Sequence, residues 1–242
     1  MDRAGSHSPH DVAASAIDWW NEAGVDVLVD ESPRNWLRAK VPAPVAAPDP
    51  TAAPAPSGFP DQLDMFQAYL RDAEDLSFAS RGARRVCPSG DPASGLMIVT
   101  DMPAAEDCTA GVLLSGETGR LFDRMLAAIG RDRASTYLAS LSCFRSPDGR
   151  LAGEAGQQCV AVARHHIGIA APKSLLIFGD SCARALLGLS VMQARGRWHR
   201  VPTHAGEIPA IVTFSPAYLL DQPAAKRHAW ADLQLLMQGP QA

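Results

Sequence analysis

The fold is decided around Thr213-Phe214-Ser215-Pro216-Ala217-Tyr218-Leu219-Leu220, where an apolar run meets a turn that contains proline. Residues 208–214 predict a strand, and residues 224–237 predict an amphipathic helix after the turn. A strand that leads directly into a helix is typical of a parallel sheet covered by helices. Ligands of such sheets bind at the carboxyl ends of the strands, so this turn is a candidate functional site.

The preceding residues repeat the same alternation of strands and helices. Short runs that are apolar on both faces predict three further strands, at residues 96–99, 137–141 and 174–178. Apolar residues at helical spacing predict helices at residues 61–70, 121–129, 160–169 and 181–187. Together these elements predict an α/β fold: a three-layer α/β/α sandwich around a central, mainly parallel four-stranded sheet.

The amino-terminal quarter of the chain differs in composition from the rest. A segment rich in Pro and Ala predicts an extended linker over residues 41–60, between an N-terminal helical extension (1–40) and the main domain (61–242). In the extension we expect a helix that begins at Asp11, contains Trp19 and Trp20, and stops at Gly24. The adjacent tryptophans either dock a protein partner or fold back onto the chain's own domain.

Composition limits the class of protein. The 242 residues have a formal net charge of -4, which gives no overall electrostatic reason to bind nucleic acid, although a local groove can still be basic. The chain lacks a long apolar run and starts with polar residues, so we expect a cytoplasmic protein that does not enter a membrane. Its five cysteines are dispersed, which favours free thiols over disulfides. We expect a monomer.

The opening stretch resembles the last signature of the bacterial uracil-DNA glycosylases of the family-4 type. That signature is His-Pro-Ala-Tyr-Leu-Leu, followed by Lys-Arg-x-x-Trp-x-Asp-Leu, which matches residues 226–233 here. The family histidine stabilises negative charge on the departing uracil, and its place is taken by Ser215, whose hydroxyl brings no positive charge. The resemblance assigns Ser215 to catalysis and assigns four residues to a loop that inserts into the DNA minor groove: Pro216, Ala217, Tyr218 and Leu219. The same loop residues are also compatible with a helix start that packs on the core.

A second resemblance follows the first strand. Residues 100–107 are similar to the family loop Gly-Glu-Ala-Pro-Gly-x-x-Glu-Asp, whose acid assists the attack of water on the sugar. The resemblance places Asp101 at this acid, one methylene shorter, and Leu114 at the Phe that stacks on the base. The base pocket would then be formed by Thr100, Met102, Pro103, Leu114 and, from the next motif, Ser140. The alternative for Asp101 is an aspartate that caps a turn at the strand end.

The third matching motif follows the second strand. Residues 137–150 resemble Tyr-Ile-Thr-Asn-Val-Val-Lys-Cys-Arg-Pro-Pro-x-Asn-Arg, whose first Asn recognises uracil through paired hydrogen bonds. Alignment on Tyr137 and Arg145 puts Ser140 at this Asn, whereas alignment on Cys143 puts Ala139 there. Neither side chain donates and accepts as an amide does, so base discrimination is expected to be weakened. Arg145 is assigned to DNA binding.

Many family-4 enzymes hold a [4Fe-4S] cluster on four cysteines. The first two ligand positions fall near Ala73 and Leu76, and the third falls at Phe144. Only Cys159 is close to a ligand position, with Cys143 as a remnant or a core thiol, and so few thiolates do not hold such a cluster. The histidines show no metal-ligand spacing. We therefore expect neither a cluster nor another metal.

A further similarity, Phe178-Gly179-Asp180-Ser181 and the following helix, concerns positions that are mainly structural in the family. Altogether the motifs predict a uracil-DNA glycosylase-like protein of base-excision repair that binds DNA, flips a damaged or deaminated base and hydrolyses its N-glycosidic bond. Four departures in one pocket predict weakened or altered specificity. The alternatives are a catalytically inactive DNA-binding or repair-scaffold protein of the same fold and a small-nucleotide binder.

Overall fold

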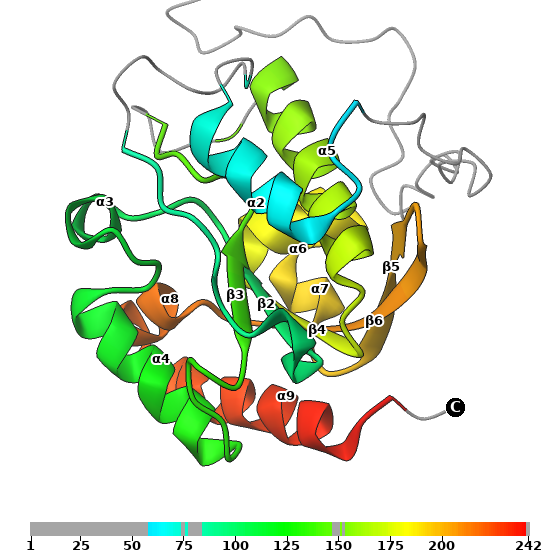
Figure 1. Ribbon diagram of the computed structural model, residues 1–242. Coiled ribbons are helices and arrows are strands. Elements are labelled where there is room, and N and C mark those ends of the chain that lie inside the picture. The colour runs from blue at the N-terminus through cyan, green and yellow to red at the C-terminus, as the bar shows by residue number, and fades with distance from the viewer. Residues whose placement is uncertain (1–57, 74–75, 77–83, 147–150, 152, 241–242) are drawn as a thin grey trace, which may run out of the picture. The chain divides into compact units, whose positions relative to one another are not determined.

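The computed structural model describes residues 58–73, 76, 84–146, 151 and 153–240. The predicted extension (1–40) and nearly all of the linker (41–60) lie outside the described residues, so these two boundaries stay predictions. The described residues form an α/β structure with a six-stranded sheet in the order β1-β3-β2-β4-β6-β5 (Figure 1). The predicted α/β fold is confirmed, and the sheet has two strands more than we predicted.

The four predicted strands form the centre of the sheet. They are β2 (Leu96–Thr100), β3 (Tyr137–Ser140), β4 (Ser174–Phe178) and β6 (Gly206–Thr213). The pairs β2–β3, β2–β4 and β4–β6 are all parallel. Their carboxyl ends therefore lie at one edge of the sheet, where Thr100 is in register with Ser140, and Phe178 with Thr213.

The two additional strands are antiparallel and lie at the edges. Strand β1 (Ser89–Gly90) pairs with β3, and β5 (Trp198–Thr203) forms a hairpin with β6. β1 has only two residues, both exposed, so it leaves no hydrophobic pattern. β5 alternates poorly and contains Pro202, which is tolerated at a sheet edge.

Helices cover both faces of the sheet (Figure 1). One layer contains α5 (Gly153–Ala170) and α6 (Gly179–Leu187), with α2 (Leu63–Asp72) packed outside α5. The other contains α4 (Gly116–Ala128), the short α8 (Pro216–Asp221) and α9 (Lys226–Gln238). Two shorter helices, α3 (Ala105–Ala110) and α7 (Val191–Ala194), and two 3-10 turns, η1 (Pro92–Ser94) and η2 (Pro223–Ala225), complete the connections. None of the described helices has the length and apolar character that crossing a membrane requires.

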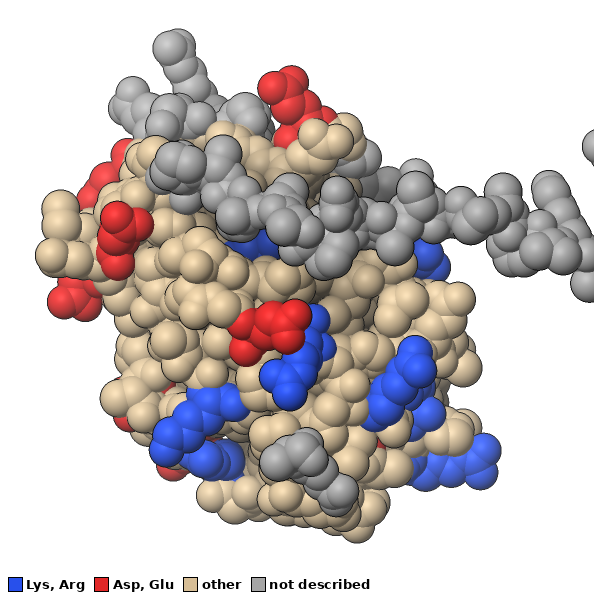
Figure 2. Space-filling view, turned by 90° about the vertical axis from the view of Figure 1, so that its right-hand side faces the viewer, with Lys and Arg blue, Asp and Glu red and all other residues tan. Residues whose placement is uncertain are grey.

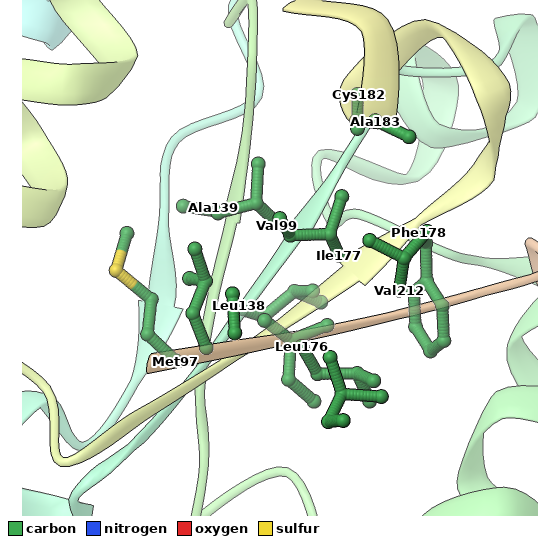
Figure 3. Packing of buried hydrophobic residues seen from close by; sticks show 14 of the residues in the cluster. Met97, Val99, Leu138, Ala139, Leu176, Ile177, Phe178, Cys182, Ala183 and Val212 are labelled. Atoms are coloured by element: carbon green, nitrogen blue, oxygen red, sulfur yellow. The ribbon is translucent and has the colours of Figure 1, made fainter. Parts of the chain in front are cut away.

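The main core lies on both sides of the central strands. Val99 and Ile177 point to the side of Cys182 and Ala183 of α6, whereas Leu176 and Phe178 point to the opposite face (Figure 3). There Phe178 meets Phe122 of α4 edge-on, with ring centroids 6.0 Å apart. Strands buried on both faces are continuous in apolar residues rather than alternating, which is why the sequence reveals them.

A buried ion pair joins α9 to Arg195, the residue that follows α7, and a hydrogen bond links the same carboxylate to the end of β6. The carboxylate of Asp232 is fully buried, accepts hydrogen bonds from Arg195 Nη2 (3.1 Å) and Nε (3.3 Å), and accepts a third from Thr213 Oγ1 (2.8 Å). Arg195 Nη2 also donates to the carbonyl oxygen of His228 (2.9 Å). These contacts fix the last residue of β6, two positions before Ser215.

Candidate functional site

The candidate site lies at the carboxyl ends of the parallel strands, as predicted. Asp101 directly follows β2, Leu141 follows β3, Gly179 and Asp180 follow β4, and Ser215 follows β6 by one residue. The structure brings these residues around two cavities that share Asp101, Asp180 and an adjacent serine, Ser181. The larger is a cleft of about 690 Å³ that extends toward α5, and the smaller, of about 310 Å³, extends toward Ser215 and α8.

Asp101 is the carboxylate common to both cavities. Its Oδ1 atom is buried and has no hydrogen-bond partner among the described residues. The turn after β2 is instead held by Asp107, whose Oδ2 accepts from the backbone N–H of Ala104 (3.1 Å) and whose Oδ1 accepts from Ser115 N (2.7 Å). An unpaired buried carboxylate oxygen costs stability unless a ligand completes it, so this geometry favours the functional interpretation of Asp101.

Two buried thiols, Cys159 and Cys182, lie close enough to Asp101 for its charge to affect their pKa values. Burial raises the pKa of Cys159 to about 11, and the negative charge of Asp101 contributes to this increase. Burial likewise raises the pKa of Cys182 well above its usual value, again with a contribution from Asp101. Both cysteines are therefore neutral at physiological pH. Neither thiol adds a negative charge beside the carboxylate of Asp101.

Ser215 caps the helix that follows β6. Its Oγ accepts a hydrogen bond from the backbone N–H of Tyr218 (3.3 Å) at the N-terminus of α8. Serine is well suited to this position, because its short side chain returns to the first turn of the helix. Opposite it, Gly179 has a φ of +83°, and a Cβ on Gly179 would lie 3.5 Å from Cβ of Ser215. Ser215 thus lines the smaller cavity with a neutral hydroxyl.

Of the five predicted base-pocket residues, Met102 lines the larger cleft and the other four line neither cavity. Thr100, Pro103 and Leu114 are buried. Ser140 Oγ donates to the carbonyl oxygen of Ser142 (2.8 Å). The structure therefore does not gather these five residues into one pocket.

Leu114 is displaced by the path of its loop. Its φ is +51°, an uncommon conformation for leucine, and its carbonyl oxygen accepts from Arg133 Nη2 (2.6 Å). Gly119 permits this path, since a Cβ there would lie 2.2 Å from the same carbonyl oxygen. The loop is thus held against α4, with the side chain of Leu114 in the main core.

The predicted DNA-binding residues divide into surface and core positions. Ala217 is exposed, and Tyr218 is 45% exposed with its ring stacked on Phe214 (centroids 4.9 Å apart). Pro216 is buried, and Leu219 is 1% exposed and packs in the main core. Arg145 is exposed, and its Nη1 donates to the carbonyl oxygen of Pro103 (3.3 Å). Tyr218 and Ala217 are therefore the loop residues available to a partner.

Several cleft residues were not predicted. Asp180 and Ser181 belong to the Gly-Asp-Ser segment after β4, so its position at a strand end was the available signal. Asp180 pairs with Arg184, which lowers the pKa of Asp180. Gln157 and Val160 come from the first turns of α5, and no motif indicated that this helix lines the cleft.

Figure 2 shows how charged side chains are distributed over one face of the molecule. On the face shown in Figure 2, Lys and Arg side chains lie in separate groups with acidic side chains among them. This agrees with the formal net charge of -4 and shows no continuous basic patch on that face. Any phosphate contact on this face would therefore rest on individual arginines and lysines.

The buried cysteines do not fit an iron–sulfur cluster. Such a cluster is usually held by four thiolates, and among the family positions only Cys159 and the nearby Cys143 offer thiols, both of them buried. The two family ligand positions nearest α2 are occupied by Ala73 and Leu76. Among the described residues no group of three or more His, Cys, Asp or Glu is placed to hold a metal ion. Because other residues are not described, the absence of a cofactor stays a prediction.

Comparisons with known proteins agree with this geometry. The model of the uracil DNA glycosylase superfamily matches residues 87–234, which include all six strands and every strand end of the site. A type-4 uracil-DNA glycosylase of Pyrobaculum aerophilum is 26% identical over 157 residues, which cover 62% of this chain and 80% of the relative. The predicted resemblance to family 4 is confirmed. Because the family model spans more than half of its length, the chain belongs to the uracil-DNA glycosylase superfamily.

Proposed function

We propose that this protein acts in DNA base-excision repair, where it flips a damaged or deaminated base and hydrolyses its N-glycosidic bond with weakened or altered base specificity. The observation that carries the proposal is the unpartnered buried oxygen of Asp101 between two cavities at the strand ends. Superfamily membership and the type-4 relative support it. We further propose that the protein acts as a cytoplasmic monomer and that its N-terminal helix contacts a protein partner.

Asp101 and Ser215 divide the proposed chemistry. The carboxylate of Asp101 orients a water molecule and stabilises positive charge on the sugar as the glycosidic bond breaks. Ser215 lines the smaller cavity beside Asp101 with a neutral hydroxyl and supplies no positive charge, so departure of the base is slower than with an imidazole donor. This division predicts an active but slow enzyme.

The direct test uses oligonucleotides that contain uracil, hypoxanthine or xanthine. We expect alkali-labile abasic sites on at least one of the three, formed slowly because Ser215 replaces a histidine. The measurement is strand cleavage after alkali, with an undamaged duplex as the control.

Failure on all three together with retained duplex binding would favour the second candidate, a catalytically inactive DNA-binding protein. The neutral Ser215 and the engaged hydroxyl of Ser140 are the observations that favour that candidate.

The exposed apolar side chains at the smaller cavity predict where DNA is distorted. Met192 on α7 is 69% exposed and Tyr218 is 45% exposed, and both line this cavity. Apolar side chains inserted between bases unstack them, so Tyr218→Ala and Met192→Ala should each reduce base unstacking about tenfold. The measurement is the fluorescence increase of 2-aminopurine beside the target base. Met65→Ala is the matched control, because Met65 is 58% exposed on α2 and lines neither cavity. Equal fluorescence for all three variants would contradict the prediction.

A further inference from the structure

The larger cleft has walls suited to a flat ring. It lies between the ends of β2 and β3 and the first turns of α5 and α6. Its apolar lining comes from Met102, Leu141, Leu151, Val160 and Ala185. Gly153 and Gly156 carry no side chain into it, which leaves the α5 side open. Apolar walls with a few polar groups are typical of small-ligand sites.

Two charged side chains of the cleft are already engaged with each other. Arg184 Nε donates to Asp180 Oδ2 (2.5 Å), and Asp180 Oδ1 accepts from the backbone N–H of Val191 (2.9 Å). Asp101 Oδ1, the hydroxyl of Ser181 and the side-chain amide of Gln157, an exposed residue, have no hydrogen bond within the described residues. Within the described residues no hydrogen bond holds the amide of Gln157, and it is the one amide side chain among the residues that line the cleft.

A side-chain amide can form paired hydrogen bonds that the hydroxyl of Ser140 cannot. It presents one acceptor and two donors in a plane, and so can form two parallel hydrogen bonds with a lactam, in which a ring N–H stands next to a carbonyl. Uracil and hypoxanthine both carry such an edge. Ser140 has a single hydroxyl, whose hydrogen is donated to Ser142 within its own loop.

We propose that the larger cleft receives the flipped base and that Gln157 recognises its lactam edge. Gln157 would replace the asparagine of the family motif, whose position at the end of β3 is occupied by Ser140. The inference rests on the proposed function, because it assumes that a base leaves the duplex. It places the sugar near Asp101, where the two cavities meet, and the base between Met102 and α5. Specificity would then come from a helix rather than from the strand-end motif.

The test measures binding of free bases and needs no hydrolysis. The full chain carries ¹⁵N-labelled glutamine side chains, and the signal pair lost in Gln157→Ala identifies this amide. We expect 1-methyluracil or 9-methylhypoxanthine, in which the glycosidic nitrogen is blocked as it is in DNA, to shift that pair saturably. The corresponding 1,3-dimethyluracil and 1,9-dimethylhypoxanthine, which lack the lactam N–H, should leave it unchanged. Gln157→Ala should weaken binding about tenfold or more, as expected for two lost hydrogen bonds.

Gln158→Ala is the matched control, because Gln158 is the next residue of α5 but does not line the cleft. It should bind the bases as the wild type does. Absence of a saturable shift with either base, or unchanged affinity in Gln157→Ala, would overturn the inference. If Gln157 responds but no oligonucleotide yields abasic sites, base recognition stands while the proposed hydrolysis fails.

Discussion

Asp101→Asn is expected to slow base release by about 10²–10⁴-fold while duplex binding is retained, since this is the usual contribution of a positioned acid or base. Asparagine has nearly the same shape, so the cavities at the strand ends should be preserved. It cannot accept a proton from water or stabilise the sugar cation by charge. The measurement is the single-turnover rate of abasic-site formation on the best substrate of the oligonucleotide panel.

Two further variants sharpen this experiment. Asp101→Glu restores the longer carboxylate of the family loop and should keep activity well above that of Asp101→Asn. Asp64→Asn removes an exposed carboxylate from the first turn of α2 and should leave the rate unchanged. Equal rates for Asp101→Asn and the wild type would show that another group performs the chemistry.

Asp101→Asn should not lower the melting temperature, although it lowers the rate of base release. Among the described residues Asp101 Oδ1 is buried without a hydrogen-bond partner, and an unpaired buried oxygen costs free energy in the ligand-free protein. Asp101→Asn should therefore leave the melting temperature unchanged or raise it slightly, as happens when a functional site is neutralised. A structural aspartate would show the reverse, a fall in melting temperature with the loss of its contacts.

The elements that could be predicted from the sequence are those whose pattern is local. Strand β4 begins and ends at the predicted residues, 174 and 178, because all but the first are buried on both faces. α5 begins at Gly153, seven residues before the predicted start, because its first turns contain glycines and polar residues. β5 was missed because an edge strand paired on one side needs no apolar face.

The residues of the candidate site show the same difference between local sequence signals and tertiary contacts. Asp101 and Ser215 were also assigned from the family resemblance, but each follows a strand, and parallel strands place their carboxyl ends together, so both line the smaller cavity. Leu114 and Ser140 were assigned to the base pocket by motif position alone. Their true surroundings depend on how Arg133 holds one loop and on how Ser140 bonds within another. The approach of α5 to the strand ends is a tertiary contact, so the place of Gln157 had no local signal.

The ion pair of Asp232 and Arg195 should carry the largest stability effect in the described domain. Asp232 is 0% exposed and Arg195 is 18% exposed, so removal of either leaves a poorly solvated charge. Asp232→Ala should lower the free energy of unfolding by about 3–5 kcal/mol, as is usual for a broken buried pair. For a chain of this size the melting temperature would fall by about 10 °C, which calorimetry measures.

The control is the exposed pair of Arg120 and Glu117, whose atoms are 2.8 Å apart. Arg120→Ala should cost less than about 1 kcal/mol, because water replaces the lost contact. Asp232→Asn keeps an acceptor for Thr213 and should be milder than Asp232→Ala. If Asp232→Ala were no more destabilising than Arg120→Ala, the buried pair would have no special role.

The pH dependence of Arg195→Ala gives the strictest test of this pair. Burial raises the pKa of Asp232, while Thr213 and Arg195 act to lower it. Without Arg195 the folded-state pKa rises further above the unfolded value, so stability is retained where Asp232 is protonated and is lost as the pH rises through the raised pKa. The deficit of Arg195→Ala relative to the wild type should thus be larger at about pH 8 than at about pH 5. In Asp232→Asn this dependence should disappear, because residue 232 no longer titrates, and its persistence there would assign the effect to another group.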